Sequence, residues 1–176
     1  MKKTCITFFA IFILIASVIG GALTFKPQKT EYLRIHIRAN SNLEKDQQVK
    51  MLVKSAVVDF LTPLVSEIDT TTEAEEKLTK NLSKIENVAD NVLKNNGFSY
   101  RSKAKIKEEK FPTRTYGELI LPVGYYDALI IELGEGEGDN WWCVIYPPLC
   151  FTGEGKNYVY KSKIEQIINK FFNKKQ

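Results

Sequence analysis

Residues 32–39 read YLRIHIRA and carry the pattern that decides the fold. Apolar Leu33, Ile35 and Ile37 alternate with polar, mostly basic side chains. Side chains in an extended chain point alternately to opposite faces, so this period of two predicts a half-buried strand. His36 falls on the polar face of that strand, where we expect it to be exposed or hydrogen-bonded.

Two helices are expected to follow this strand. Ser41 and Glu44 have the spacing of a capping box, which favours a helix start at that point. The apolar residues after it recur with helical spacing as far as Pro63, which ends or kinks the helix. A second apolar stripe, from residue 74 to residue 93, predicts one further helix, and Gly97 suits its left-handed cap.

Alternation returns after the second helix. Residues 100–109 predict a strand with a basic outer face, which is typical of an edge strand protected against edge pairing, although a row of positive charges also suits an acidic partner. Residues 113–121 and 126–133 predict two strands joined as a hairpin through the turn at residues 122–124.

The last elements complete the fold class. Residues 141–146 predict a short apolar strand, and a capping box at Ser162 and Glu165 predicts a C-terminal helix. The order is then one strand, two helices, three to four strands and a helix. This segregation predicts an α+β fold, with a mostly antiparallel sheet in a single domain over residues 32–176.

The N-terminus predicts export. Lys2 and Lys3 precede an uncharged run over residues 4–25 that ends in small residues, as in a signal peptide cut after Gly20 or Ala22. An uncleaved membrane anchor is the alternative, because the run is long enough to cross an apolar bilayer core of about 30 Å. Both interpretations place the body outside the cytoplasm. Residues 26–31 then form a short linker.

Length and charge narrow the class of protein. The chain has 176 residues, of which 44% are hydrophobic and 26% charged, enough for one domain with an apolar core. The net charge of +4 argues against a nucleic-acid partner, since such proteins concentrate positive charge.

Two cysteines remain if the N-terminal segment is removed, Cys143 and Cys150. A disulfide between them suits an exported domain, while a pair of buried free thiols is the alternative. With His36 they fall short of the four ligands of a structural zinc site, so we expect no metal and no cofactor.

No catalytic constellation stands out, and we expect that the protein is not an enzyme. A cysteine nucleophile would have to pair with His36, the only histidine, and no local motif supports that pairing. The loop at residues 134–139 reads GEGEGD, whose acids would repel a phosphate, so we expect a flexible, solvated hairpin end.

Residues 140–151 read NWWCVIYPPLCF and contain both tryptophans of the chain. Because neighbours in a strand face opposite sides, Trp141 and Trp142 are expected on opposite faces. One tryptophan then anchors the core, and the other is available as an interface anchor. Core packing alone is the alternative.

The stretch LRIHIRANSNLEKDQQVK (33–50), the stretch FPTRTYGELILPVGYYDALIIELGEGEGDNWWC (111–143) and the tryptophan-rich segment together resemble the stage II sporulation protein R family. The resemblance implies a signalling protein made in the forespore and secreted across its membrane into the intermembrane space. It also implies a partner, a membrane-embedded aspartic protease of the mother cell that cleaves the sigma E precursor. Members of the family are not known as catalysts.

On this basis we predict a partner-binding surface formed by Arg114, Tyr116 and an exposed tryptophan, Trp141 or Trp142. Two alternatives from other classes are a secreted cell-wall-associated hydrolase and a wall-binding protein.

Overall fold

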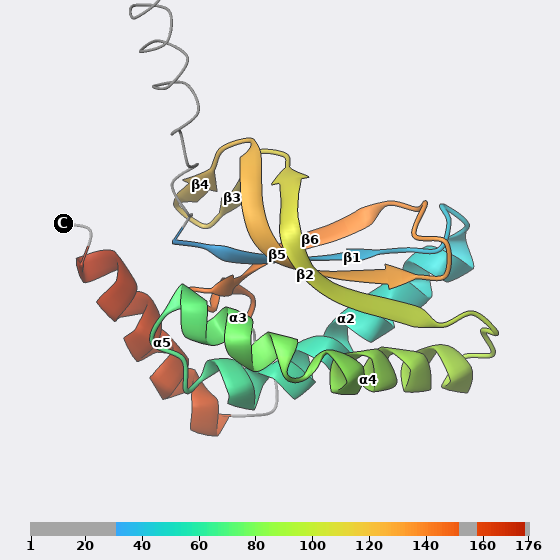
Figure 1. The fold of residues 1–176 in the computed structure, drawn as a ribbon, viewed down its shortest axis with the longest axis horizontal. Coiled ribbons are helices and arrows are strands. Elements are labelled where there is room, and N and C mark those ends of the chain that lie inside the picture. Colours follow the sequence, from blue (N-terminus) through green and yellow to red (C-terminus); the bar gives the residue numbers. More distant parts are fainter. Residues whose placement is uncertain (1–30, 152–157, 175–176) are drawn as a thin grey trace, which may run out of the picture.

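The computed structural model describes residues 31–151 and 158–174, and the predicted signal segment (1–25) and most of the linker lie outside them. The described residues form an α+β domain, as expected (Figure 1). The helices are α2 (Glu44–Val65), α3 (Thr71–Thr79), α4 (Leu82–Asn95), η1 (Leu149–Phe151) and α5 (Tyr158–Asn173). The strands are β1 (Leu33–Arg38), β2 (Ser102–Phe111), β3 (Arg114–Tyr116), β4 (Leu119–Leu121), β5 (Gly124–Leu133) and β6 (Asn140–Tyr146).

The main sheet has the strand order β2-β5-β1-β6. Strand β1 lies inside it, parallel to β5 and antiparallel to β6, and β2 is antiparallel to β5. The expected mostly antiparallel sheet is therefore confirmed, with β2 and β6 at its two edges. Edge position for the basic strand β2 agrees with its row of lysines.

The helices cover one face of this sheet (Figure 1). Leu33, Ile35 and Ile37 of β1 are buried against them, as the alternation predicts. Val53 and Leu61 are fully buried parts of the α2 stripe in the same core. Burial of each such aliphatic side chain stabilises the fold by roughly 1.5–3 kcal/mol, so this face holds the main core.

Helix boundaries differ from the predicted ones. The stripe from residue 74 to residue 93 belongs to two helices, because the chain breaks at Lys80 and Asn81 between α3 and α4. Both helices bury their apolar positions in the same core, so the break leaves no trace in the periodicity. Helix α2 begins at Glu44 with Leu43 as N-cap and without a side-chain cap, so the first predicted capping box is wrong.

The second predicted capping box is also wrong, because α5 begins at Tyr158, four residues before Ser162. The predicted hairpin between residues 113–121 and 126–133 is a third correction. Strand β5 pairs with β2 along its whole length, down to the pair Phe111 and Gly124. The segment between them folds back on itself as the β3–β4 hairpin, whose turn contains Gly117 at φ +60°. That conformation favours glycine, which supports a tight turn there.

The glycine-rich loop at residues 134–139 keeps Glu135, Glu137 and Asp139 exposed, as expected, but its backbone is docked against residues 39–41. The amide of Glu135 donates to the Asn40 side chain over 3.0 Å, and the Gly138 amide donates to the carbonyl of Ala39 over 2.9 Å. Gly138 lies so close to Ser41 that a Cβ there would be 2.3 Å from the Ser41 carbonyl oxygen. Close approach of two backbones, more than flexibility, explains this glycine.

Candidate partner-binding surface

The face of the sheet away from the helices carries a second, smaller core. Phe111, Tyr126, Ala128 and Ile130 are buried there, with Trp142 packed beside them. The β3–β4 hairpin lies at one end of this face (Figure 1). Side chains that alternation assigned to the polar side of β1 are therefore enclosed.

Arg34 is the largest of these enclosed side chains and has no exposed surface. Its guanidinium carbon lies 4.1 Å from the centre of the Phe111 ring and 4.8 Å from that of Tyr126. Desolvated cation–π contacts of this kind contribute about 2 kcal/mol each. Burial lowers the pKa of Arg34, and the described residues give its Nε and Nη1 atoms no hydrogen-bond acceptor.

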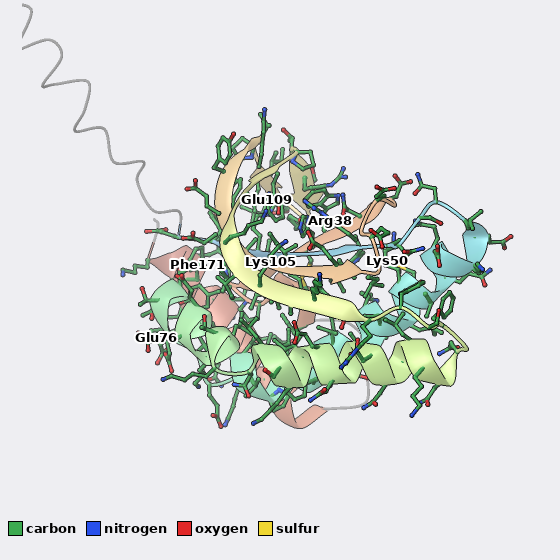
Figure 2. All side chains as sticks on the ribbon, turned by 45° about the vertical axis from the view of Figure 1, so that its right-hand side comes forward. Arg38, Lys50, Glu76, Lys105, Glu109 and Phe171 are labelled. Atoms are coloured by element: carbon green, nitrogen blue, oxygen red, sulfur yellow. A yellow bond between two sulfur atoms is a disulfide. The ribbon has the colours of Figure 1, made fainter. Side chains whose placement is uncertain are left out.

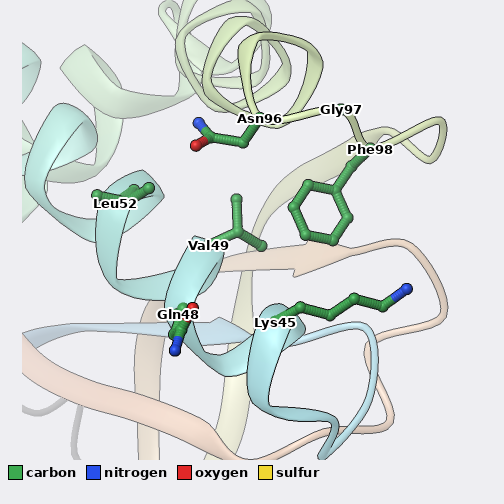
Figure 3. Close-up of a pocket in the computed structure, with 7 residues that line it drawn as sticks. All are labelled: Lys45, Gln48, Val49, Leu52, Asn96, Gly97 and Phe98. Atoms are coloured by element: carbon green, nitrogen blue, oxygen red, sulfur yellow. The ribbon is translucent and has the colours of Figure 1, made fainter.

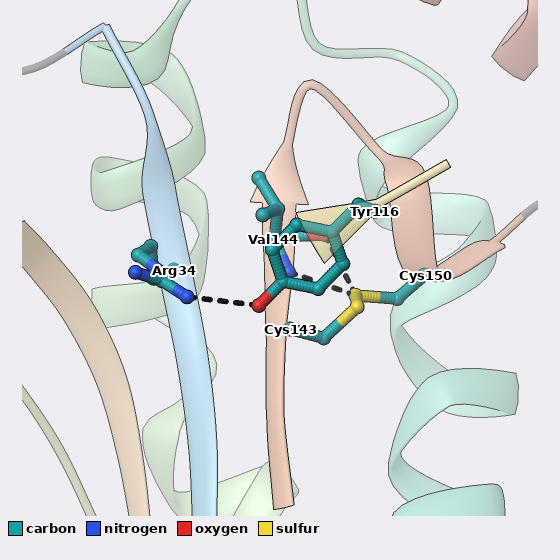
Figure 4. The surroundings of a disulfide bond; sticks show 5 residues. All are labelled: Arg34, Tyr116, Cys143, Val144 and Cys150. Carbon is teal, nitrogen blue, oxygen red and sulfur yellow. Dashed lines mark hydrogen bonds between the residues drawn. A yellow bond between two sulfur atoms is a disulfide. The ribbon is translucent and has the colours of Figure 1, made fainter. Parts of the chain in front are cut away.

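The remaining nitrogen of Arg34 anchors the hairpin. Nη2 donates a hydrogen bond of 2.8 Å to the hydroxyl of Tyr116 in β3 (Figure 4). Arg114 lies two residues earlier on the same face of β3, is exposed, and has its guanidinium carbon 5.9 Å from the Trp142 ring centre. The structure thus brings together three of the four predicted binding residues: Arg114, Tyr116 and Trp142.

Trp141, the fourth predicted residue, lies on the opposite face. It packs at the border of the main core, with the ammonium group of Lys54 from α2 at 5.8 Å from its ring centre. Both tryptophans are half-buried. The expectation that they point to opposite faces is met, and Trp142 is the one beside Arg114.

His36 is fully buried, which corrects the expected exposed or hydrogen-bonded position. Its ring centre lies 4.7 Å from that of Trp142 and 5.4 Å from that of Phe111. Its Nε2 atom is 3.2 Å from Oε2 of Glu109, but neither ring nitrogen has a well-aligned hydrogen bond within the described chain. Burial, helped by the positive charge of Arg38, lowers the pKa of His36 to about 3, so the ring is neutral at physiological pH.

A group of ion pairs lies next to His36. Arg38 contacts both Glu109 and Glu132, and Lys105 pairs with Glu132 over 2.7 Å (Figure 2). Lys107 adds a contact of 3.6 Å to Glu109. These carboxylates are thus already engaged by cations of the same chain. Sequence reasoning missed this group because His36 and Glu109 meet only through the pairing of β5 with both β1 and β2.

The stretch after β1 has a structural role. The buried carboxylate of Asp46 accepts hydrogen bonds from Ser41, Asn40 and Tyr100. Although burial raises the pKa of Asp46, these hydrogen bonds hold it below its usual value. The Ser41 hydroxyl donates to Asp46 and accepts from the amide of Leu43, which precedes α2, so its oxygen does not cap the helix. These residues fix the start of α2 against the docked loop.

Cys143 and Cys150 are joined in a disulfide (Figure 4). Cys143 pairs with Ile35 in the sheet and lies on the helix-covered face, whereas His36 lies on the other. The pairing of a cysteine nucleophile with His36 therefore finds no support. Within residues 31–151 and 158–174, no group of three or more histidine, cysteine or acidic side chains gathers in a form that could hold a metal ion.

A shallow cavity of about 330 Å³ lies between the start of α2 and the end of α4 (Figure 3). Its lining consists of Lys45, Gln48, Val49, Leu52, Asn96, Gly97 and Phe98. This set supplies a lysine, two amides and apolar side chains, but neither a nucleophile nor a general base. None of the predicted binding residues Arg114, Tyr116, Trp141 and Trp142 lines this cavity.

Comparisons with known proteins agree with the resemblance. The sequence profile of the stage II sporulation protein R family matches residues 29–156. The protein named Stage II sporulation protein R of Bacillus subtilis (strain 168) is 35% identical over 180 residues, which cover 97% of this chain and 80% of that relative. No solved structure matches the chain. No helix in the described part of the chain is both long and apolar enough to cross a membrane.

Proposed function

This chain belongs to the stage II sporulation protein R family, and we propose that it is a secreted signal between the two cells of a sporulating bacterium. In this proposal the forespore makes the protein and exports it into the intermembrane space. There it activates a membrane-embedded aspartic protease of the mother cell, and the protease processes the sigma E precursor. The protein itself acts as a ligand and not as a catalyst.

The observation that supports this function is the placement of Arg114 beside Trp142 on the hairpin side of the sheet, away from the helices. Arginine and tryptophan are enriched among residues that dominate binding energy in protein interfaces. Tyr116 fixes the hairpin through Arg34, so Arg114 is held in place before binding. Preorganisation of this kind lowers the entropy lost on association.

A ligand activates a two-state enzyme only through its higher affinity for the active state. Moving a population from about 1% to about 99% active requires about 10⁴-fold tighter binding to the active form, or about 5.5 kcal/mol. One half-buried tryptophan and one exposed arginine can together supply energy of this size, because single interface anchors contribute about 2–4 kcal/mol each. The binding free energy available from the proposed surface is therefore large enough for this shift.

The segment at residues 4–25 serves this function either as a cleaved signal or as a tether. Both forms place residues 32–176 outside the cytoplasm of the forespore. A tethered form would limit the reach of the signal to the facing membrane, whereas a released form would diffuse within the intermembrane space.

Co-expression of the full chain with the protease and a reporter of sigma E precursor cleavage tests the proposal. We expect cleavage with the full chain and none with a chain that lacks residues 1–22. Arg114→Ala and Trp142→Ala should each reduce cleavage at least about tenfold, whereas Lys103→Ala on the exposed surface of β2 serves as the matched control. Normal cleavage with both variants would exclude this surface.

The same experiment separates the other classes. If the full chain accumulates with the protease and no precursor is cleaved, the activating role is excluded. Saturable binding to purified peptidoglycan would then favour a wall-binding protein, and release of soluble fragments from it would favour a wall hydrolase.

A further inference from the structure

The two edges of the main sheet differ in how they are protected. On β2, the side chain of Asp90 accepts from the Ser102 amide over 2.7 Å, and Glu86 accepts from the Ala104 amide over 2.8 Å. Beyond Ala104, β2 carries lysines at alternate positions, and charged side chains of this kind oppose edge pairing. The β2 edge is thus closed to a further strand.

On β6, protection covers only the second half. The Val144 amide donates to Sγ of Cys150 over 3.0 Å, so the disulfide-closed turn lies against the edge at that point (Figure 4). In an antiparallel pair, the backbone groups of every second residue point away from the partner strand. The backbone groups of Val144 point away from β1. Trp142 and Asn140 lie two and four residues before Val144 in the same pairing with β1, so their backbone groups point away from β1 too. The described residues give these outward groups no partner.

A tryptophan stands on each side of this unpaired edge, and each has a cation beside it. Arg114 lies 5.9 Å from the Trp142 ring on one face, and Lys54 lies 5.8 Å from the Trp141 ring on the other. Among residues 31–151 and 158–174, neither cation has a carboxylate within 4 Å, whereas Arg38, Lys105 and Lys107 on the same domain are all paired. The flanks of the edge are therefore apolar and positively charged.

We propose that the edge of β6 at Asn140–Trp142 binds an extended, acidic segment of the protein partner as an added strand. The backbone groups of Asn140 and Trp142 would hydrogen-bond to the segment, as in other strand-addition complexes. Its successive side chains alternate between the two faces, so an acidic residue meets Arg114 and a neighbouring one meets Lys54. This inference rests on the proposed function and specifies the chemistry of the partner.

Hydrogen exchange on the full chain, alone and bound to the purified protease in detergent, tests this inference. We expect binding to slow exchange of the Asn140 and Trp142 amides, with no change at Ser102 and Ala104, whose amides are already capped by α4. A complex that forms and supports precursor cleavage without slower exchange at residues 140–142 would overturn strand addition and leave the proposed function standing. If neither a complex nor precursor cleavage is observed, strand addition and the proposed function are both overturned.

Charge reversal tests the acidic character of the segment. The double variant Lys54→Glu with Arg114→Glu should raise the Kd for the protease about tenfold or more, since like charges then face each other. The matched control reverses Lys84 and Lys103, which are exposed lysines away from β6. A Kd that changes equally in the two double variants would overturn an acidic occupant.

Discussion

The guanidinium of Arg34, in the central strand β1, is bound to the hydroxyl of Tyr116 in the β3–β4 hairpin at 2.8 Å. The two residues are 82 positions apart in the sequence, and Arg34 has no exposed surface. A buried cation without a carboxylate is costly, and this hydroxyl is its one hydrogen-bond acceptor within the described chain. The hairpin that carries Arg114 is thus coupled to the core.

Replacement of the acceptor should therefore affect stability. Tyr116→Phe leaves Nη2 of Arg34 buried and unpaired, and we expect the free energy of unfolding to fall by about 1–3 kcal/mol in urea denaturation. Tyr125→Phe is the control, because Tyr125 is 62% exposed and should change stability by less than about 0.5 kcal/mol. Equal effects of the two substitutions would contradict the anchoring role of Tyr116.

His36 predicts a specific dependence of stability on pH. Its pKa falls from 6.5 in the unfolded chain to about 3 in the fold, mainly through burial. Between these values the unfolded chain binds a proton that the folded chain does not, so stability decreases as the pH is lowered, by about 1.4 kcal/mol per pH unit.

The measurement compares unfolding free energies of the native chain and His36→Gln from pH 7 to pH 4. The variant should lack the share of the slope due to His36, so the difference between the two chains should change by about 3 kcal/mol across this range. Parallel pH profiles would show that His36 titrates normally in the folded state.

The disulfide between Cys143 and Cys150 should stabilise the domain modestly, because it closes a short loop with a sequence separation of 7. The chain-entropy relation gives about 2.5 kcal/mol for a loop of this size. Addition of a reductant should lower the unfolding free energy of the native chain by about this amount and leave a Cys143→Ala, Cys150→Ala double variant unchanged. Insensitivity of the native chain would contradict the prediction.

The contact of Gly138 with the Ser41 carbonyl predicts that alanine is not tolerated there. A Cβ placed 2.3 Å from that oxygen forces the loop at residues 134–139 away from residues 39–41, and we expect a loss of about 1–3 kcal/mol in thermal or urea unfolding. Glu137→Ala, an exposed position in the same loop, should change stability by less than about 0.5 kcal/mol.

Local patterns predicted the elements better than their pairing. The alternation of Leu33, Ile35 and Ile37 identified β1 and its buried face, since this face depends only on the period of the chain. The opposite orientation of Trp141 and Trp142 followed from the same rule. In contrast, β5 pairs with β2 across the inserted β3–β4 hairpin, and nothing in either strand's own sequence specifies that partner.

The candidate site could be predicted only in part, because the sequence does not show which strands pair. Arg114, Tyr116 and Trp142 were named from composition and family motifs, and they meet in space. Arg34 and His36 were missed because a polar side of a strand normally faces water. Here β1 lies between two strands and beneath a second aromatic core, so its polar side is enclosed.

The pair Phe111 and Gly124 closes the ladder between β2 and β5 directly beneath the hairpin. The twelve-residue excursion that carries Arg114 is thus an insert whose removal would leave the sheet's pairing intact. Under the proposed function, exchange of this insert between family members would transfer part of the partner preference from one chain to another. Arg34 sets the condition for such a graft: each donor hairpin has to bring an acceptor oxygen to the position of the Tyr116 hydroxyl.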